Sequence, residues 1–178
     1  MKTYLGVKMI QAKPMNRLEY NEYRGWQLPV DENGSDEGFL VEYLDGGASN
    51  HPNHKGYISW SPKEVFENAY KEVSGLTFGL AVEALNLGKR VAREGWNGKG
   101  LFVFKQVPST ISKDIVPKMQ SLPQSVKDEF ERRFNDPSFQ VDAIYYDNQM
   151  AIVNPSNLIN GWTPSPSDSL ATDWIILD

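Results

Sequence analysis

The sequence contains no cysteine among its 178 residues. Disulfide bonds, thiolate nucleophiles and thiolate metal ligands are therefore excluded. Histidine is scarce as well, because His51 and His54 are the only two and no metal-ligating pattern completes the pair, so we interpret them as turn residues. No apolar run approaches the roughly 18 residues that span a bilayer, and the N-terminus lacks the apolar core of a signal peptide. We expect a cytoplasmic protein with no membrane partner.

The common catalytic motifs are also missing. The chain has no GxSxG nucleophile elbow, no GxxxxGK[ST] phosphate loop and no GxGxxG dinucleotide motif. Asp128 and Glu129 stand one helical turn before Arg132 and Arg133, which is the pattern of salt bridges on a solvent-exposed helix. Residues 76–178 contain no histidine, so acid–base chemistry there would fall to carboxylates, lysine or tyrosine. We expect no catalytic residue, no metal site and no cofactor.

The charge is unevenly distributed. Acidic residues outnumber basic ones by 23 to 18, which gives a net charge of −5. Such a chain is a poor candidate for binding DNA or RNA, which depends on Lys and Arg contacts to phosphates. Between Lys89 and Lys105, however, five basic residues stand against Glu94 alone. An acidic protein with one basic stretch suits a small anionic ligand, and a solvated surface segment is the alternative.

The chain divides near residues 72–75 into two units, residues 1–72 and residues 76–178. Hydrophobic residues make up 40% of the chain, which is enough for packed cores. Strands without regular helical crossovers predict an α+β fold, in which each unit is an antiparallel sheet packed with one or two helices. The expected helices are 16–23, 61–71, 78–87 and 125–134, with short helical turns near Pro117 and Pro123. The expected strands are 4–12, 39–44, 56–60, 91–92, 100–107, 139–146, 150–153 and 173–177.

Local signals set several of these boundaries. Asn16, Ser61 and Thr77 are expected to cap the N-termini of three helices, because short polar side chains accept hydrogen bonds from the free N–H groups there. Gly88 is expected to end the third of these helices in a left-handed conformation. The turn-like residues 147–149 predict a hairpin between the strands 139–146 and 150–153.

The first segment that suits ligand binding is residues 90–100, RVAREGWNGKG. Its three glycines allow sharp turns that bring bare N–H groups close to a ligand, here near Gly98. Trp96 offers a flat face to a purine, and Asn97 can read a base edge or a ribose. Arg93 and Lys99 can pair with phosphate. A tight turn with a core tryptophan is the alternative.

The second segment is residues 160–169, NGWTPSPSDS. It combines another Gly-Trp step, at Trp162, with the short polar side chains of Ser165, Ser167 and Asp168. Two prolines stiffen it, so less ordering entropy is lost when a ligand binds. Ser167 or Asp168 capping a short helix at residues 169–172 is the alternative. Trp174, in the expected last strand, is interpreted as a core residue.

These segments resemble a small phage family. The resemblance lies in residues 76–85, LTFGLAVEAL, in residues 88–100, GKRVAREGWNGKG, and in the closing segments 161–168 and 171–174. It identifies about residues 76–178 as similar to the anti-Thoeris family of signal-sequestering proteins. In this sequence 72 residues precede that domain, and the insert at residues 108–138 is long for the family.

The resemblance implies a compact α+β domain that assembles as a homotetramer. It implies pockets between protomers for glycocyclic ADP-ribose, the messenger of bacterial TIR-domain enzymes, and in some relatives separate sites for cyclic dinucleotides. The protein would then act in the cytoplasm of the infected bacterial host as a phage anti-defence protein that leaves its ligand intact. The expected ligand-binding residues are Arg93, Trp96, Asn97, Gly98, Lys99, Trp162, Ser165, Ser167 and Asp168.

Other readings stay open. Residues 13–15, 23–26, 38–43 and 56–62 resemble a small domain that often precedes this family in phage proteins, to which no function is attached. Residues 76–178 could instead hydrolyse a cyclic nucleotide. They could also form a structural or protein-inhibitory phage module, because Trp-rich glycine loops suit protein interfaces.

Overall fold

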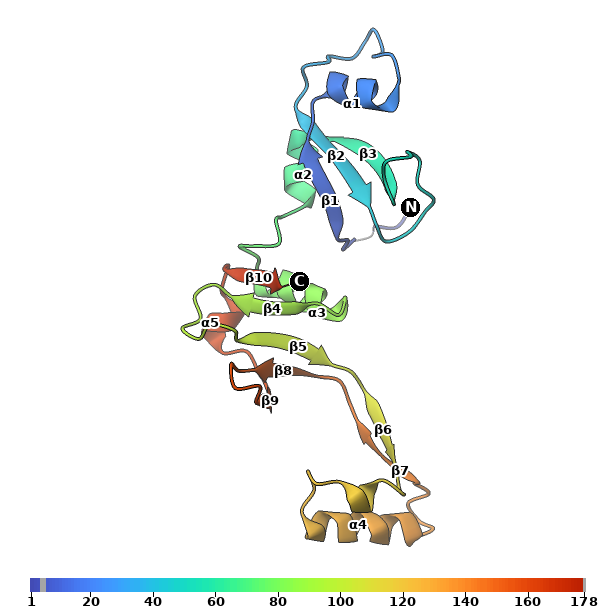
Figure 1. The fold of residues 1–178 in the computed structure, drawn as a ribbon, viewed down its shortest axis with the longest axis vertical. Coiled ribbons are helices and arrows are strands. Elements are labelled where there is room, and N and C mark those ends of the chain that lie inside the picture. The colour runs from blue at the N-terminus through green and yellow to red at the C-terminus, as the bar shows by residue number, and fades with distance from the viewer. Residues whose placement is uncertain (4–5, 178) are drawn as a thin grey trace. The chain divides into compact units, whose positions relative to one another are not determined.

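The computed structural model describes the chain except for residues 4, 5 and 178. It divides into two units, Met1–Glu72 and Val73–Asp178. Both contain helices packed on antiparallel strands, which confirms the α+β class (Figure 1). In the described part of the chain, no helix has both the length and the apolar character needed to cross a membrane.

The first unit is a three-stranded antiparallel sheet in the order β1-β2-β3, formed by Ile10–Pro14, Gly38–Tyr43 and Tyr57–Pro62. Strand β1 begins at Ile10, later than expected, because its partner β2 ends at the opposite residue, Tyr43. The expected start, residues 4 and 5, lies outside the described residues. The core on one face of the sheet is Tyr20, Leu40 and Ile58.

Two helices accompany this sheet, α1 at Arg17–Arg24 and α2 at Lys63–Ala69. Asn16 caps α1 as expected, since its side chain accepts the Glu19 N–H at 2.8 Å and the Glu19 side chain accepts the Asn16 N–H at 2.9 Å. The expected cap at Ser61 is wrong. Ser61 belongs to β3, where it lies opposite Phe39, and α2 begins after Pro62 without a side-chain cap.

The second unit contains a five-stranded antiparallel sheet in the order β10-β4-β5-β8-β9. The strands are Arg90–Arg93 (β4), Phe102–Gln106 (β5), Gln149–Val153 (β8), Ile159–Gly161 (β9) and Trp174–Leu177 (β10). Helix α3, Phe78–Asn86, covers one face and packs Ala81 and Leu85 on Val91 and Val103. The expected cap at Thr77 is confirmed, as is the left-handed Gly88, with φ of 78°. Strand β9 was not expected.

The expected hairpin between residues 139–146 and 150–153 is wrong. Strand β7, Ala143–Tyr146, pairs with an unexpected strand β6, Ser109–Ser112, whereas β8 pairs with β5. The pairs Gln106–Gln149 and Ser109–Tyr146 follow one continuous register. The four strands therefore form one long hairpin, broken at residues 107–108, where Pro108 has no N–H to donate.

The outer half of this hairpin carries two further helices. A 3-10 turn, η1 at Val116–Lys118, packs against α4, Gln124–Asn135 (Figure 1). On α4, Glu129 pairs with Arg132 and Arg133 at 2.8 Å each, which confirms the solvent-exposed salt-bridge pattern. We call residues 107–148 the arm.

Candidate functional site

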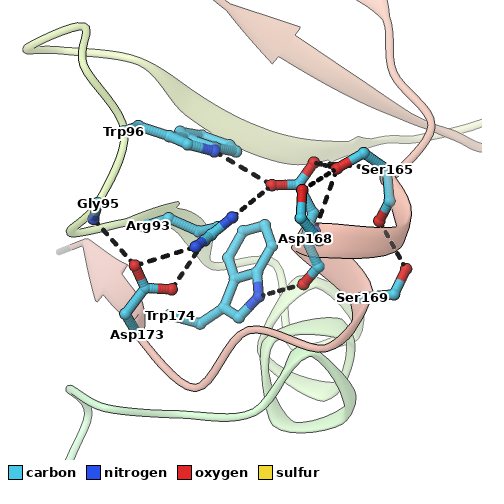
Figure 2. Close-up of polar contacts among 9 residues, drawn as sticks. Arg93, Gly95, Trp96, Ser165, Asp168, Ser169, Asp173 and Trp174 are labelled. Carbon is cyan, nitrogen blue, oxygen red and sulfur yellow. Dashed lines mark hydrogen bonds and ion pairs between the residues drawn. The ribbon is translucent and has the colours of Figure 1, made fainter.

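The two segments singled out in the sequence meet at one place in the second unit. Residues 93–100 leave β4, and residues 161–169 run from β9 into α5, Pro166–Ser169. Asp168 joins them, because its Oδ1 accepts hydrogen bonds from Arg93 Nη1 at 2.8 Å and from Trp96 Nε1 at 3.3 Å (Figure 2). Neither contact was expected, since the sequence separates the partners by more than 70 residues.

Arg93 lies between two carboxylates. Its Nε and Nη2 donate to the two carboxylate oxygens of Asp173 at 2.7 and 3.3 Å, in addition to the Nη1 contact with Asp168. Only 20% of the Arg93 side chain and 13% of the Asp168 side chain are exposed, so solvent screens these pairs weakly. The hydrogen bond from Arg93 lowers the pKa of Asp173, and the two carboxylates raise the pKa of Arg93. All three groups are therefore charged at neutral pH.

Asp168 also takes part in the capping box at the start of α5, in which Ser165 is the N-cap. Ser165 Oγ donates to Asp168 Oδ2 at 2.6 Å, and the Asp168 N–H donates back to Ser165 Oγ at 3.1 Å. Burial opposes ionisation of Asp168, but the hydrogen bonds from Ser165, Arg93 and Trp96 outweigh it and lower the pKa to about 2. The expected cap is therefore wrong: Ser165, and neither Ser167 nor Asp168, is the N-cap, and the helix is Pro166–Ser169 instead of residues 169–172. Ser167 Oγ lies 2.9 Å from Ser165 Oγ.

Three tryptophans pack edge to face beside these ion pairs. The ring centroid of Trp174 lies 5.5 Å from that of Trp96 and 6.0 Å from that of Trp162, with interplanar angles near a right angle. Trp174 is fully buried, as expected for a core residue, and its Nε1 donates to the Asp168 carbonyl at 3.0 Å. Trp96 and Trp162 are only partly buried. Each of them could therefore contact both the core and a ligand.

The glycine loop is fixed at one end and open at the other. The Gly95 N–H donates to Asp173 Oδ2 at 3.0 Å, and a Cβ at Gly95 would lie 2.7 Å from the same oxygen. Gly100 has a φ of 84°, which favours glycine. Between them, Asn97 and Lys99 are exposed and Gly98 is partly buried. The loop thus presents an amide and an ammonium group from a rigid base.

Asp173 is the functional residue that sequence reasoning missed. It lies within the matching segment 171–174, but its partner Arg93 is 80 residues away and no local pattern links them. Among the residues that the structure describes, no three side chains of the metal-ligating types come together. We call Arg93, Trp96, Asp168, Asp173 and Trp174 the Arg93 corner.

The histidines of the first unit do more than form a turn. His54 Nδ1 lies 2.6 Å from Glu42 Oε2, and His54 Nε2 lies 2.9 Å from the Tyr23 hydroxyl. Glu42 also accepts the N–H groups of Lys55 and Gly56 at 2.9 Å each. The hydrogen bonds from His54 and the backbone lower the pKa of Glu42. This cluster ties the loop that follows β2 to the sheet.

Comparisons with known proteins identify a family for the second unit. A family model for the Thoeris anti-defense 2-like domain matches residues 76–177. The protein Thoeris anti-defense 2 of Bacillus phage SP01 is 32% identical over 102 residues, which are 57% of this chain and 94% of that protein. The family match includes the whole Arg93 corner and excludes residues 1–72.

Proposed function

The chain belongs to the Thoeris anti-defense 2-like family, and from this we propose that it counteracts Thoeris defence by binding a cyclic nucleotide messenger and holding it intact. The proposed ligand is glycocyclic ADP-ribose, with cyclic dinucleotides as further candidates. The observation that carries the proposal is the meeting of both motif segments at Asp168, which places partly exposed Trp96 beside the exposed Asn97 and Lys99.

The proposed ligand contacts use the ring faces and polar groups that contacts within the protomer do not occupy. Trp96 stacks on a base with the ring surface that Trp174 does not cover, and Asn97 hydrogen-bonds a base edge or a ribose. Lys99 and the N–H groups near Gly98 contact phosphate. Arg93 is already bound by two carboxylates, so its main contribution is to orient Trp96 and Asp168. Trp162, Ser165 and Ser167 complete the site near the start of α5.

The ionisation of the site favours binding over hydrolysis. A general acid must hold a proton near the working pH, yet Asp168 has a pKa of about 2 and the pKa of Asp173 is also lowered. Arg93 is held as a cation, so it is a poor base. The second unit has no histidine to take either role.

The proposal includes a homo-oligomer, expected to be a tetramer, with the ligand between protomers. In that arrangement the exposed loop residues of one protomer face the next, and the ligand is shielded from water. Light scattering at micromolar concentration measures this directly. A monomer under these conditions would contradict a site between protomers.

Calorimetric titration of folded variants with glycocyclic ADP-ribose tests the site. Trp96→Ala should weaken binding by about 1–3 kcal/mol through lost stacking. Trp26→Ala is the matched control, because Trp26 is 53% exposed and belongs to the first unit. Equal affinity of Trp96→Ala and the wild type would contradict the proposed site. A parallel titration with a cyclic dinucleotide tests the second ligand class.

A further inference from the structure

The chain contains three Asn-Gly steps, at residues 33–34, 97–98 and 160–161. Glycine has no side chain, so its backbone nitrogen approaches the side-chain carbonyl of a preceding asparagine more easily than that of any other residue. This approach is the first step in the spontaneous loss of an asparagine amide. The structure holds the three steps in different ways, and the difference singles out one of them.

The step at Asn33 is held by hydrogen bonds on both sides. Asn33 Oδ1 accepts the Ser35 N–H at 3.1 Å and the Ser35 hydroxyl at 2.8 Å. The Asn33 carbonyl accepts the Asp36 N–H at 3.1 Å, and the Gly34 carbonyl accepts the Leu18 N–H at 2.9 Å. The carbonyl group that would be attacked is therefore engaged, and the main chain around it is fixed.

The step at Asn160 is held by a sheet. Asn160 belongs to β9, where it lies opposite Ile152 of β8. Just beyond the step, the Trp162 N–H donates to the Met150 carbonyl at 2.8 Å. Closure of a ring between an asparagine side chain and the next nitrogen requires rotation of the asparagine backbone, and this strand pairing opposes the rotation.

The step at Asn97 has neither restraint. Asn97 is exposed and lies between β4 and β5, outside any strand or helix. Among the residues that the structure describes, neither the Asn97 side chain nor the Gly98 N–H has a hydrogen-bond partner. The Gly98 carbonyl accepts the Leu101 N–H at 3.5 Å, which is long for a hydrogen bond. Both reacting groups are therefore free.

We propose that Asn97-Gly98 is a modification site, at which the unliganded protein slowly converts Asn97 into aspartate or isoaspartate. The Gly98 nitrogen attacks the side-chain carbonyl carbon of Asn97, a new C–N bond closes a succinimide ring, and the side-chain amide leaves as ammonia with the proton that Gly98 gives up. Water then opens the ring at either carbonyl. One opening gives aspartate, and the other gives isoaspartate, in which the main chain is one carbon longer.

The consequence for the ligand rests on the proposed function. Conversion removes the amide donor with which Asn97 reads a base or a ribose. It also places a carboxylate two residues from Lys99, where it repels the phosphate that Lys99 is proposed to contact. A bound messenger engages the Asn97 amide and holds the loop, so it slows the reaction. Empty copies therefore lose affinity with time, whereas loaded copies keep it.

Peptide mapping by mass spectrometry tests the site on the full chain, incubated in a mildly alkaline buffer at physiological temperature. Asn97 should lose its amide about tenfold faster than Asn33 or Asn160, because ring closure there breaks no hydrogen bond. In concentrated urea the three steps should react at similar rates, since the fold no longer separates them. An Asn97 rate equal to the other two in the folded chain, or the same preference for Asn97 in urea, would overturn the proposal.

Calorimetric titration with glycocyclic ADP-ribose tests the consequence. Asn97→Asp reproduces one product and should bind the messenger about tenfold more weakly than the wild type. Asn33→Asp is the matched control and should keep the wild-type affinity. Saturating messenger should slow the loss of the amide at Asn97 and leave the rate at Asn33 unchanged. Equal affinity of Asn97→Asp and the wild type would overturn the consequence. Failure of the fresh wild type to bind the messenger would contradict the proposed function, and the rates from mass spectrometry would still decide the modification site.

Discussion

Both units anchor a glycine-containing loop with a carboxylate, but the carboxylates have different partners. In the second unit, Asp173 accepts the Gly95 N–H and is paired with Arg93. In the first unit, Glu42 accepts the Gly56 N–H and is paired with His54. Arginine stays charged at every relevant pH, so Arg93 meets its two carboxylates as a permanent cation.

The two clusters also differ in what they support. The Glu42 cluster closes on itself, because both ring nitrogens of His54 are occupied by Glu42 and Tyr23. The Arg93 corner instead fixes the base of a loop whose Asn97 and Lys99 stay exposed. In both units a carboxylate anchors a loop through a backbone N–H and a basic side chain. In the first unit this arrangement closes the loop, whereas in the second unit it leaves loop side chains exposed, and only the exposed loop suits ligand binding.

The largest expected effect is on the core of the second unit. Trp174→Ala removes a fully buried ring and should lower the free energy of unfolding of that unit by about 3–5 kcal/mol. Urea denaturation followed by far-UV circular dichroism measures it. In the first unit, Trp26→Ala should cost less, about 1 kcal/mol, because Trp26 is 53% exposed and loses mainly its edge contact with Tyr20. Similar costs for the two variants would break the distinction between core and surface tryptophans.

Removing the cation compares the two clusters directly. Arg93→Ala leaves Asp168 and Asp173 partly buried without a counter-charge and should cost about 2–3 kcal/mol, between the values for exposed and buried pairs. His54→Ala should cost less, about 1–2 kcal/mol, because Glu42 keeps two backbone N–H donors. Thermal unfolding at pH 7 measures both. A larger loss for His54→Ala would reverse the comparison.

Acid should weaken the Arg93 corner in a defined window. The pKa of Asp168 falls from an ordinary 3.8 to about 2 in the folded state, so its contribution to stability is present above about pH 4 and is lost as pH falls towards 2. The shift corresponds to about 2 kcal/mol. Urea unfolding at pH 5 and at pH 2.5 measures the loss, and Asp168→Asn should reduce it. The lowered pKa of Glu42 gives the first unit a loss of the same sign.

A smaller effect is expected at the start of α5. Ser165→Ala removes the side chain that caps the helix and should cost about 1 kcal/mol. Ser167→Ala, two residues further along, keeps that cap and should change stability by less than about 0.5 kcal/mol. Thermal unfolding of both variants tests the assignment. Equal shifts for the two serines would remove Ser165 from the capping role.

Deletion of the first unit is expected to leave the ligand affinity of the second unit unchanged, which is the smallest expected effect. The family match begins at residue 76, and a stretch of 102 residues of this chain covers 94% of the phage relative, so residues 73–178 should fold alone. Titration of this fragment with glycocyclic ADP-ribose should give the wild-type affinity. A folded fragment that no longer binds would show that the first unit contributes to the site or to the assembly.

Local signals predicted much of this fold. Asn16, Thr77 and Gly88 were placed correctly, because a cap depends on residues within one helical turn. Ser61 was misplaced because pairing with β2 extends β3 through Pro62, and this pairing outweighs the capping tendency of a serine. Long-range pairing also explains the missed strands, since residues 147–149 resemble a turn in sequence but lie within a long hairpin.

The same limit applies to the site. Composition and spacing singled out Trp96 and Asp168 separately, but nothing local joins them, and Asp173 became visible only through its contact with Arg93. Sequence reasoning therefore found the segments of the site, while the ion pairs that hold them together required the fold.

The most direct test of the central claim is the recovery of the messenger. The full chain is incubated with glycocyclic ADP-ribose, freed of unbound ligand by gel filtration and denatured by heat, and the released small molecules are separated by chromatography. Sequestration predicts the unchanged cyclic nucleotide in near-stoichiometric amount. Release of a linear or cleaved product, or recovery of no nucleotide at all, would contradict the account.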